Sequence, residues 1–156
     1  MIDIAIPGFG ELKLANLVLD FNGTLAVDGK MLPGVFDRLS ALSSRLGIHV
    51  VTADTFGLVR TSLAGLDATL TILAADKQDE AKLNYVRQLG SAQTGAVGNG
   101  RNDRLMLKEA ALGIGVILGE GASSLTLSAA DVVCTSIGDA LDLLTHPLRL
   151  TATLRS

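Results

Sequence analysis

The stretch Leu17-Val18-Leu19-Asp20-Phe21-Asn22-Gly23-Thr24-Leu25 indicates how the chain folds. Its apolar start is typical of a strand buried in a parallel sheet, and the glycine indicates a tight turn at the strand's end. Ligands of open α/β sheets bind just beyond the carboxyl ends of such strands, which is where Asp20 stands. Asn22 and Gly23 tolerate the backbone angles of a loop that offers N–H groups to an anion, and the hydroxyl of Thr24 adds a donor. The stretch therefore predicts a phosphate-binding loop.

The composition fits one domain with an aliphatic core. Of the 156 residues, 48% are hydrophobic but only 3% are aromatic, so Leu, Val, Ile and Ala must fill the interior. A net charge of −3 gives no general attraction to nucleic acid or to an anionic membrane. We find neither a membrane span nor a secretory signal and expect a cytoplasmic protein. We predict a single domain over residues 1–156.

The single cysteine and the two histidines are poor candidates for catalysis. Cys134 lies in an apolar stretch that favours a buried, inert thiol, and one cysteine cannot form an internal disulfide. His49 lies inside an apolar run, and His146 precedes a proline in a predicted loop. Neither histidine has a Cys or His partner at ligand spacing, so we expect no zinc site.

Strands and helices are predicted to alternate along the chain. Residues 2–6 and 11–14 are expected to form an N-terminal hairpin that leads into the first core strand, 16–20. Gly47 is expected to end the first helix as its C-terminal stop. The order predicts an α/β fold, a doubly wound, mostly parallel sheet with short connections. Further strands are expected over 48–51, 69–73, 94–97, 114–118 and 132–134, and helices over 34–46, 55–64, 79–89, 104–111 and 122–130, before two C-terminal helices.

Polar residues at the ends of later strands extend the candidate site. Thr52 follows the strand at 48–51, and Gly98-Asn99-Gly100-Arg101-Asn102-Asp103 follows the strand at 94–97. Mg²⁺ takes oxygen ligands, which Asp20, the amide oxygen of Asn99 and a backbone carbonyl are suited to supply. The strand ends therefore predict a site for a phosphate and a hard cation.

In this order the motifs resemble those of the haloacid dehalogenase (HAD) superfamily. The stretch from Asp20 to Leu25 resembles the first motif, Thr52 the second and Lys82 the third. Residues 98–103 resemble the fourth motif, in the form found in P-type ATPases. The whole chain is similar to the small soluble proteins called P-type-ATPase-like. The resemblance implies an HAD-like Rossmannoid fold, with no cap domain between the motifs.

The resemblance also implies chemical roles. Asp20 would be the nucleophile that forms an aspartyl-phosphate, Thr52 would hydrogen-bond the phosphoryl group, and Lys82 would neutralise its charge. Lys77 is the alternative for the lysine, because the loop lengths leave the alignment open. Asp103 would orient Asn99 or a metal-bound water. The residues expected to bind the phosphate are Gly23, Thr24, Gly98 and Gly100, and those expected around Mg²⁺ are Asp20, Asn22, Asn99 and Asp103.

Two positions depart from the superfamily's pattern. Asn22 stands where its phosphatases carry the Asp that acts as general acid and base, and an amide cannot transfer that proton. Losing such a group costs about 10²–10⁴-fold in rate. Asn99 stands where a metal-binding Asp is usual, so Mg²⁺ should bind more weakly or only together with phosphate. We therefore expect a slow catalyst.

The first hypothesis is an Mg²⁺-dependent phosphohydrolase or phosphotransferase that acts through Asp20 on a phosphorylated small molecule or macromolecule. The second is a phosphate- or phospholigand-binding regulatory module without turnover. A receiver-like domain is a third option, against which the motif at 98–103 argues. The N-terminal hairpin and the aliphatic C-terminal helices are suited to a homo-oligomer.

Overall fold

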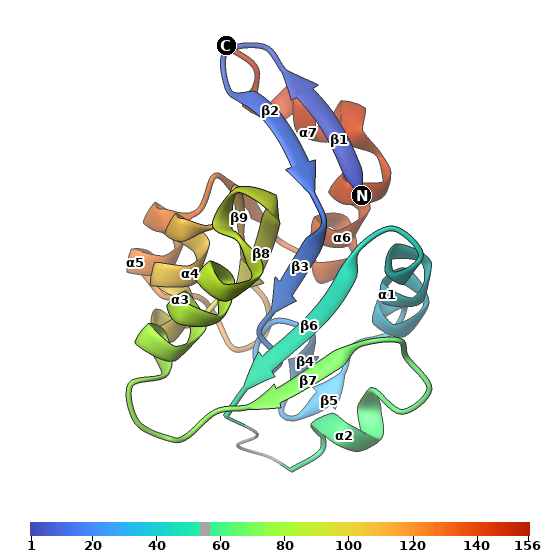
Figure 1. Ribbon diagram of the computed structural model, residues 1–156. Coiled ribbons are helices and arrows are strands. Elements are labelled where there is room, and N and C mark those ends of the chain that lie inside the picture. Colours follow the sequence, from blue (N-terminus) through green and yellow to red (C-terminus); the bar gives the residue numbers. More distant parts are fainter. Residues whose placement is uncertain (54–56) are drawn as a thin grey trace.

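The computed structural model describes residues 1–53 and 57–156. At its centre lies a six-stranded sheet in the order β10-β9-β8-β3-β6-β7 (Figure 1). Every neighbouring pair in this sheet is parallel. The strands are β3 (Asn16–Leu19), β6 (Gly47–Thr52), β7 (Thr69–Ile72), β8 (Thr94–Gly98), β9 (Leu112–Val116) and β10 (Val132–Cys134). Chain order reverses on either side of β3, and open α/β sheets bind their ligands at such a switch point.

Two antiparallel hairpins lie outside the central sheet. The N-terminal hairpin pairs β1 (Ile2–Ile6) with β2 (Gly10–Leu14), and its continuation becomes β3. A much shorter hairpin pairs β4 (Ala26–Val27) with β5 (Lys30–Met31), directly after the Asp20 loop. We call this second hairpin, residues 26–31, the flap.

Helices cover both faces of the sheet (Figure 1). Because consecutive strand residues point to opposite faces, Leu17 and Leu19 join one apolar cluster and Val18 joins the other. The cluster around Val18 contains residues of α3 and α4, whereas the cluster around Leu17 contains residues of α1, α6 and α7. The α-helices are α1 (Val35–Ser43), α2 (Val59–Ser62), α3 (Gln78–Leu89), α4 (Arg104–Glu109), α5 (Ser124–Ala129), α6 (Ile137–Thr145) and α7 (Pro147–Leu154), and short 3-10 turns cover η1 (Ser91–Gln93) and η2 (Arg101–Asp103).

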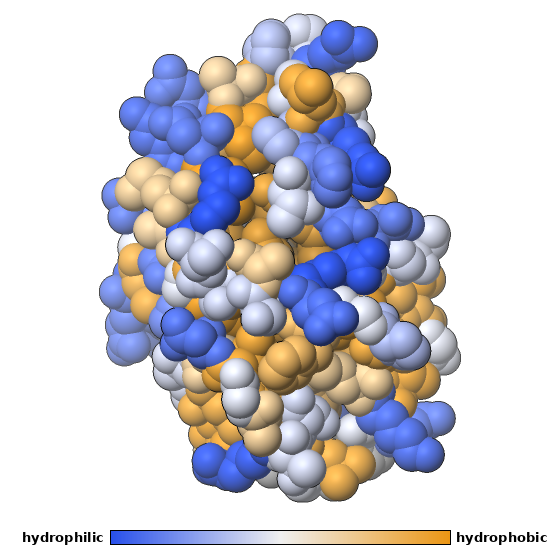
Figure 2. Space-filling view, turned by 90° about the vertical axis from the view of Figure 1, so that its right-hand side faces the viewer, coloured by the Kyte–Doolittle hydropathy of each residue, from blue (hydrophilic) through white to orange (hydrophobic). Residues whose placement is uncertain are grey.

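The N-terminal hairpin buries its apolar face within the chain. Ile2, Ile4 and Ile6 alternate with exposed residues, and all three belong to the same cluster as Leu150 of α7. Leu148, two residues earlier in α7, is 82% exposed. Across the face shown in Figure 2, apolar surface is interrupted by hydrophilic residues. Among the described residues, no helix has the length and hydropathy needed to cross a membrane.

The structure confirms the predicted fold class, and its differences from the prediction are local. Gly47 does not stop the first helix: α1 ends at Ser43, and the N–H of Gly47 donates to the Ala15 carbonyl as β6 begins. The strand expected over 114–118 begins two residues earlier, at Leu112. Of the helix expected over 55–64, residues 55 and 56 lie outside the described residues, and the described part is helical only over Val59–Ser62. In the described residues no cap separates the motif-bearing segments.

Helix α4 can pack closely against β9 because residue 113 is a glycine. A Cβ at Gly113 would clash with the backbone carbonyl of Leu107 in α4. A Cβ at Gly95, in the neighbouring strand β8, would meet Leu17 at an ordinary 3.5 Å. Backbone atoms cannot move aside as a flexible side chain can. An added methyl group therefore fits at position 95 but clashes at position 113.

We predict that Gly113→Ala lowers the free energy of unfolding by about 1–3 kcal/mol, as overpacking in a core does. Gly95→Ala is the matched control and should cost less, because its new methyl group finds ordinary contacts. Denaturant unfolding monitored by circular dichroism measures both variants. Equal losses in the two variants would show that the α4–β9 approach does not limit stability.

Candidate active site

A small cavity opens at the carboxyl ends of β3, β6 and β8. Its volume is about 240 Å³. Residues from five separate segments surround it, because the parallel strands end at one edge and direct their following loops there. The lining residues are Asp20, Asn22, Thr52, Ala53, Gln78, Asn99, Gly100, Asn102 and Glu120.

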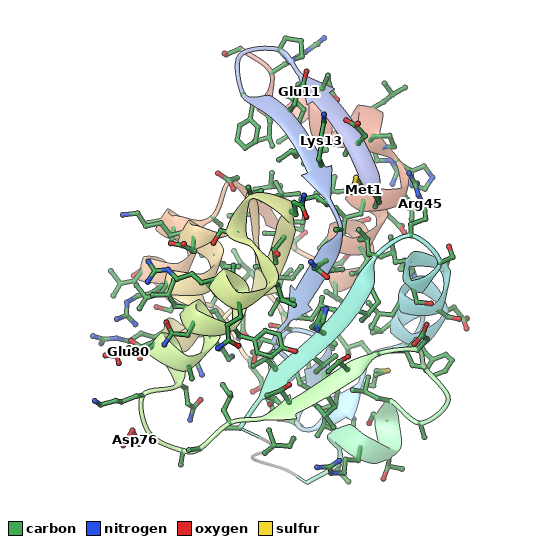
Figure 3. All side chains as sticks on the ribbon, in the orientation of Figure 1. Met1, Glu11, Lys13, Arg45, Asp76 and Glu80 are labelled. Carbon is green, nitrogen blue, oxygen red and sulfur yellow. The ribbon has the colours of Figure 1, made fainter. Side chains whose placement is uncertain are left out.

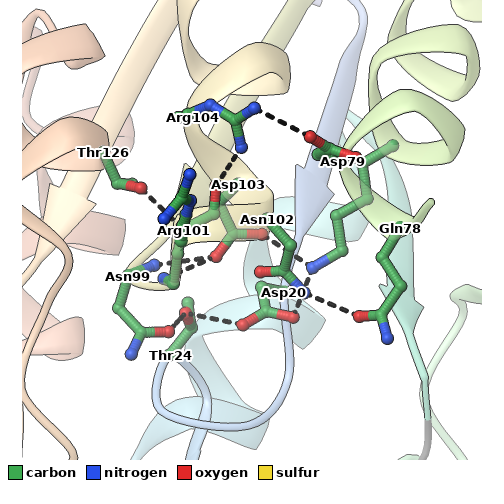
Figure 4. Close-up of polar contacts among 12 residues, drawn as sticks. Asp20, Thr24, Gln78, Asp79, Asn99, Arg101, Asn102, Asp103, Arg104 and Thr126 are labelled. Carbon is green, nitrogen blue, oxygen red and sulfur yellow. Dashed lines mark hydrogen bonds and ion pairs between the residues drawn. The ribbon is translucent and has the colours of Figure 1, made fainter. Parts of the chain in front are cut away.

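Three charged side chains meet beside this cavity, away from water. The ammonium of Lys82 donates to Asp20 Oδ1 at 2.7 Å and to Asp103 Oδ1 at 2.6 Å (Figure 4). The Lys82 and Asp103 side chains are fully buried, and that of Asp20 is 9% exposed. Burying a charge is costly unless it is paired, so each of the three depends on the others. We call Asp20, Lys82 and Asp103 the charge triad.

Burial and the neighbouring charges shift the pKa values of Asp20 and Lys82. Burial, reinforced by the nearby Asp103 carboxylate, raises the pKa of Asp20 to about 7, although Lys82 opposes the shift. Burial by itself would lower the pKa of Lys82, but the two carboxylates outweigh it and hold that pKa above its usual value. Lys82 therefore stays charged, and Asp20 is the member that titrates near neutrality.

Asp103 holds the loop of residues 98–103 in place. Its Oδ2 accepts the backbone N–H groups of Asn99 at 3.0 Å and Gly100 at 2.9 Å, while its Oδ1 accepts from Lys82. The buried hydroxyl of Thr126, in α5, donates to the Gly100 carbonyl at 2.6 Å. Both oxygens of Asp103 are thus engaged by the chain itself, and the loop is fixed from two sides.

Two glycines bring the loops close to these side chains. Gly23 has a φ of +79°, and a Cβ there would also collide with the Asn99 side chain. Gly98 leaves room for Asp103, whose Cγ would lie only 2.5 Å from an added Cβ. Both positions therefore require glycine because a side chain of the site occupies the space.

Thr24 and Asn99 join the first loop to the fourth-motif loop. The hydroxyl of Thr24 lies 3.0 Å from Asn99 Oδ1 and 3.4 Å from Asp20 Oδ2, and it can donate to one of them at a time. The Asn99 amide N–H₂ donates to the Gly121 carbonyl at 3.0 Å. These bonds orient the Asn99 amide oxygen toward Thr24 and Asp20.

Asn22 has a buried oxygen that no donor of the described residues satisfies. Its Oδ1 is shielded from solvent, lacks a hydrogen-bond partner in that part of the chain, and belongs to a residue that lines the cavity beside Asp20. Buried acceptors almost always have a partner, so such an oxygen indicates an absent cation or donor. With the oxygens of Asp20 and Asn99, the donor set fits a hard divalent cation. Within the described residues no group of three or more His, Cys, Asp or Glu forms a metal cluster.

The structure brings together the residues proposed from the sequence. Asp20, Asn22, Thr52, Asn99 and Gly100 line the cavity, and Thr52 is 1% exposed. Thr24, Gly23, Gly98, Lys82 and Asp103 lie directly behind that lining, as the contacts above describe. Of the two candidate lysines, Lys82 contacts Asp20, whereas Lys77 is exposed at the start of α3.

Four lining residues were not identified as site residues from the sequence: Ala53, Gln78, Asn102 and Glu120. Gln78 and Asn102 are hydrogen-bonded to each other, with Asn102 Nδ2 donating to Gln78 Oε1 at 2.7 Å. Glu120 is exposed and accepts the backbone N–H of Asp28, in the flap, at 3.3 Å. The position of Asn102 inside the fourth motif was a usable signal. The sequence gives no such signal for Gln78 and Glu120, because only folding brings the start of α3 and the loop after β9 to the cavity.

The histidines and the cysteine lie away from the cavity lining. The ring of His49 contacts the Tyr85 hydroxyl at 3.0 Å and Asn16 Oδ1 at 3.3 Å, and burial lowers the pKa of His49. Burial likewise raises the pKa of the Cys134 thiol, which makes it a poorer nucleophile.

The raised pKa of Asp20 should make the stability of the fold depend on pH. Between the ordinary carboxyl pKa and about 7, the folded protein binds a proton on Asp20 that the unfolded chain has already lost. In buffer containing a chelator, the melting temperature of the wild type should therefore fall, relative to Asp20→Asn, as pH rises from 4 to 7, and then level off. Thermal unfolding followed across that range measures it. Parallel curves for the two proteins would mean that Asp20 titrates normally.

The sequence matches two curated proteins of Methanocaldococcus jannaschii. It is 57% identical to the uncharacterized protein MJ0073 over 60 residues, which are 38% of this chain and 64% of that protein, less than two thirds of its length. It is 49% identical to the uncharacterized protein MJ0072 over 39 residues, which are 25% of this chain and 89% of that protein. No model of a known protein family matches the sequence.

Solved structures with the same fold include phosphatases. The cobalt-bound deoxy-D-mannose-octulosonate 8-phosphate phosphatase of Haemophilus influenzae superposes with a TM-score of 0.70 at 14% identity, covering 92% of this chain and 94% of that one. The 3-deoxy-D-manno-octulosonate 8-phosphate phosphatase of Moraxella catarrhalis, in complex with magnesium, phosphate and KDO, gives a TM-score of 0.65 at 17% identity, covering 91% and 94%. Identities this low establish the fold and not the activity. The chain belongs to the same family as MJ0072 of M. jannaschii, and it has the fold of the HAD superfamily.

Proposed function

We propose that the protein is a divalent-metal-dependent phosphohydrolase that transfers a phosphoryl group to Asp20. The observation that carries this proposal is the charge triad, in which a fully buried lysine holds one oxygen of Asp20 beside a phosphate-sized cavity. Phosphatases with the same fold support it. Under the proposal, residues 1–156 act as a single domain.

The proposed reaction has two steps. A carboxylate oxygen of Asp20 attacks phosphorus, the bond from phosphorus to the ester oxygen breaks, and the leaving oxygen takes a proton from water. A water molecule then attacks the aspartyl-phosphate, which releases inorganic phosphate and restores the carboxylate. Lys82 stabilises the charge that develops on the phosphoryl oxygens, and Thr52 donates a hydrogen bond to them.

We assign the metal to oxygens of Asp20, Asn22 and Asn99. When bound, Mg²⁺ would offset the negative charge of the phosphate next to a carboxylate. Asp103 is assigned the positioning role, because both of its oxygens already accept hydrogen bonds from the chain. The charge triad carries only one net negative charge, two carboxylates against one ammonium, so the cation should bind weakly until phosphate joins it.

Asn22 should make the second step slow. Its amide neither donates a proton to the leaving group nor removes one from the attacking water. The competing function is a module that binds phosphate or a phospholigand without turnover, and the unsatisfied Asn22 oxygen is compatible with that role as well. Phosphoryl transfer to Asp20 separates the two functions.

The first test is intact-mass spectrometry after incubation with acetyl phosphate and Mg²⁺. We expect a phosphoryl adduct on the wild type, no adduct without the metal, and none on Asp20→Asn. The adduct should last long enough to detect, because Asn22 slows its hydrolysis. If no adduct forms and no phosphate is released, the protein is a binding module.

The second test restores the missing acid. Asn22→Asp should speed loss of the phosphoryl adduct by about 10²–10⁴-fold, the usual contribution of a positioned general base. Asn102→Asp is the matched control, because it adds the same charge to the same cavity from a different loop, and it should bring no such gain. Decay of the adduct mass and release of inorganic phosphate report the rates. An unchanged rate in Asn22→Asp would refute the role given to position 22.

A further inference from the structure

A second cavity adjoins the candidate active site and has a different electrostatic character. Its volume is about 420 Å³, and it lies between the start of α3 and the turn η2. Gln78 and Asn102 line both cavities, and they are hydrogen-bonded to each other at 2.7 Å. This amide pair is therefore a wall common to the two spaces. The two cavities are therefore neighbours that share these two side chains.

Cations predominate in the second cavity. Its charged lining consists of Lys77, Arg101, Arg104 and one carboxylate, Asp79. Asp79 is already paired with Arg104, whose guanidinium contacts it at 2.9 Å and also donates to the Arg101 carbonyl. Lys77 and Arg101 form no ion pair with any residue that the structure describes. Two uncompensated positive charges thus face one hollow in a chain whose net charge is −3.

The other acidic side chains near the start of α3 are not part of this lining. Asp76 and Glu80 lie outside the lining, and in Figure 3 both are drawn at the outer edge of the molecule beside the start of α3. Glu120 lines only the first cavity, on which the Asp20 carboxylate also borders. Among residues 1–53 and 57–156, no aromatic side chain lines either cavity. The cationic lining is suited to an anionic group of a ligand.

We propose that the substrate is a small phosphate monoester with a second anionic group, which Lys77 and Arg101 bind in the second cavity. The inference rests on the proposed function, since it assumes that the ester phosphate occupies the cavity beside Asp20. The amide pair of Gln78 and Asn102 lies between the two anions, where it can donate to and accept from hydroxyl groups of the connecting carbons. The second anion is a carboxylate or a phosphate, because both accept hydrogen bonds from ammonium and guanidinium groups.

The test compares ligands that share one three-carbon skeleton. Glycerol 3-phosphate has no second anion, 3-phosphoglycerate has a carboxylate, and propane-1,3-diol bisphosphate has a second phosphate. Calorimetry on Asp20→Asn with Mg²⁺ measures binding without turnover, and phosphate release by the wild type measures hydrolysis. We expect at least one doubly anionic ligand to bind about tenfold more tightly than glycerol 3-phosphate, the gain typical of one charge-assisted contact, and to lose that advantage at high salt. Whichever of the two binds more tightly identifies the second anion.

Variants of the cationic residues locate the effect. In the Asp20→Asn background, Arg101→Gln and Lys77→Gln should each reduce the preference for the doubly anionic ligand, and together they should abolish it. Lys108→Gln is the matched control, because it removes an equal charge from an exposed position of α4 outside this cavity and should keep the preference. Melting curves check that each variant folds.

The outcomes separate this inference from the proposed function. Equal binding of all three ligands, or a preference that survives the double variant, would overturn the second anion site. A preference that depends on Lys77 and Arg101, together with no phosphate release from any ligand by the wild type, would support the anion site and contradict the hydrolase.

Discussion

The ammonium of Lys82, buried between the carboxylates of Asp20 and Asp103, is the interaction on which the site depends. Its three members come from the end of β3, the middle of α3 and the turn before α4, so the charge triad ties together three elements that are distant in sequence. Removing Lys82 would leave two buried carboxylates without a counter-charge, which costs about 3–5 kcal/mol. The geometry of the candidate nucleophile is thus coupled to the stability of the fold around it.

The same charge balance constrains the chemistry. Asn22 and Asn99 replace carboxylates that the HAD pattern would supply, and each replacement removes one negative charge from the region of the cavity. Less negative charge weakens the attraction for a cation but also reduces repulsion of a phosphate. Lys82 stays charged and Asp20 has a pKa of about 7. Under the proposed function, protonation of this carboxylate therefore decides whether Asp20 can attack at neutral pH. The charge of a ligand bound beside Asp20 should therefore affect the protonation of Asp20.

Access to the cavity is governed by short segments rather than by a large cap. Glu120, in the loop after β9, accepts the backbone N–H of Asp28 in the flap, so two segments distant in sequence meet at the cavity's edge. Asp28 itself has a φ of +51°, a conformation that costs a non-glycine residue energy and that the tight turn between β4 and β5 imposes. Under the proposed function these segments leave the mouth open to a substrate larger than the cavity. The amide pair of Gln78 and Asn102 borders the opposite route, toward the basic residues at the start of α3.

The sequence by itself determined the α/β class, the order of the elements and the residues nearest Asp20, because these follow from local patterns: buried strands ending in polar loops, and motifs in a fixed order. It did not determine where helices end, since Gly47 could have served a helix or a strand until its N–H found the Ala15 carbonyl. It favoured Lys82 over Lys77 as the partner of Asp20 only through the family resemblance, because the loop lengths left the alignment open. Only the packing of α3 across the sheet buries Lys82 between two carboxylates and leaves Lys77 exposed beside Arg101. Side-chain direction and burial are properties of the whole fold, so only the tertiary structure shows Lys82 in contact with the candidate nucleophile and Lys77 in a separate positive cavity.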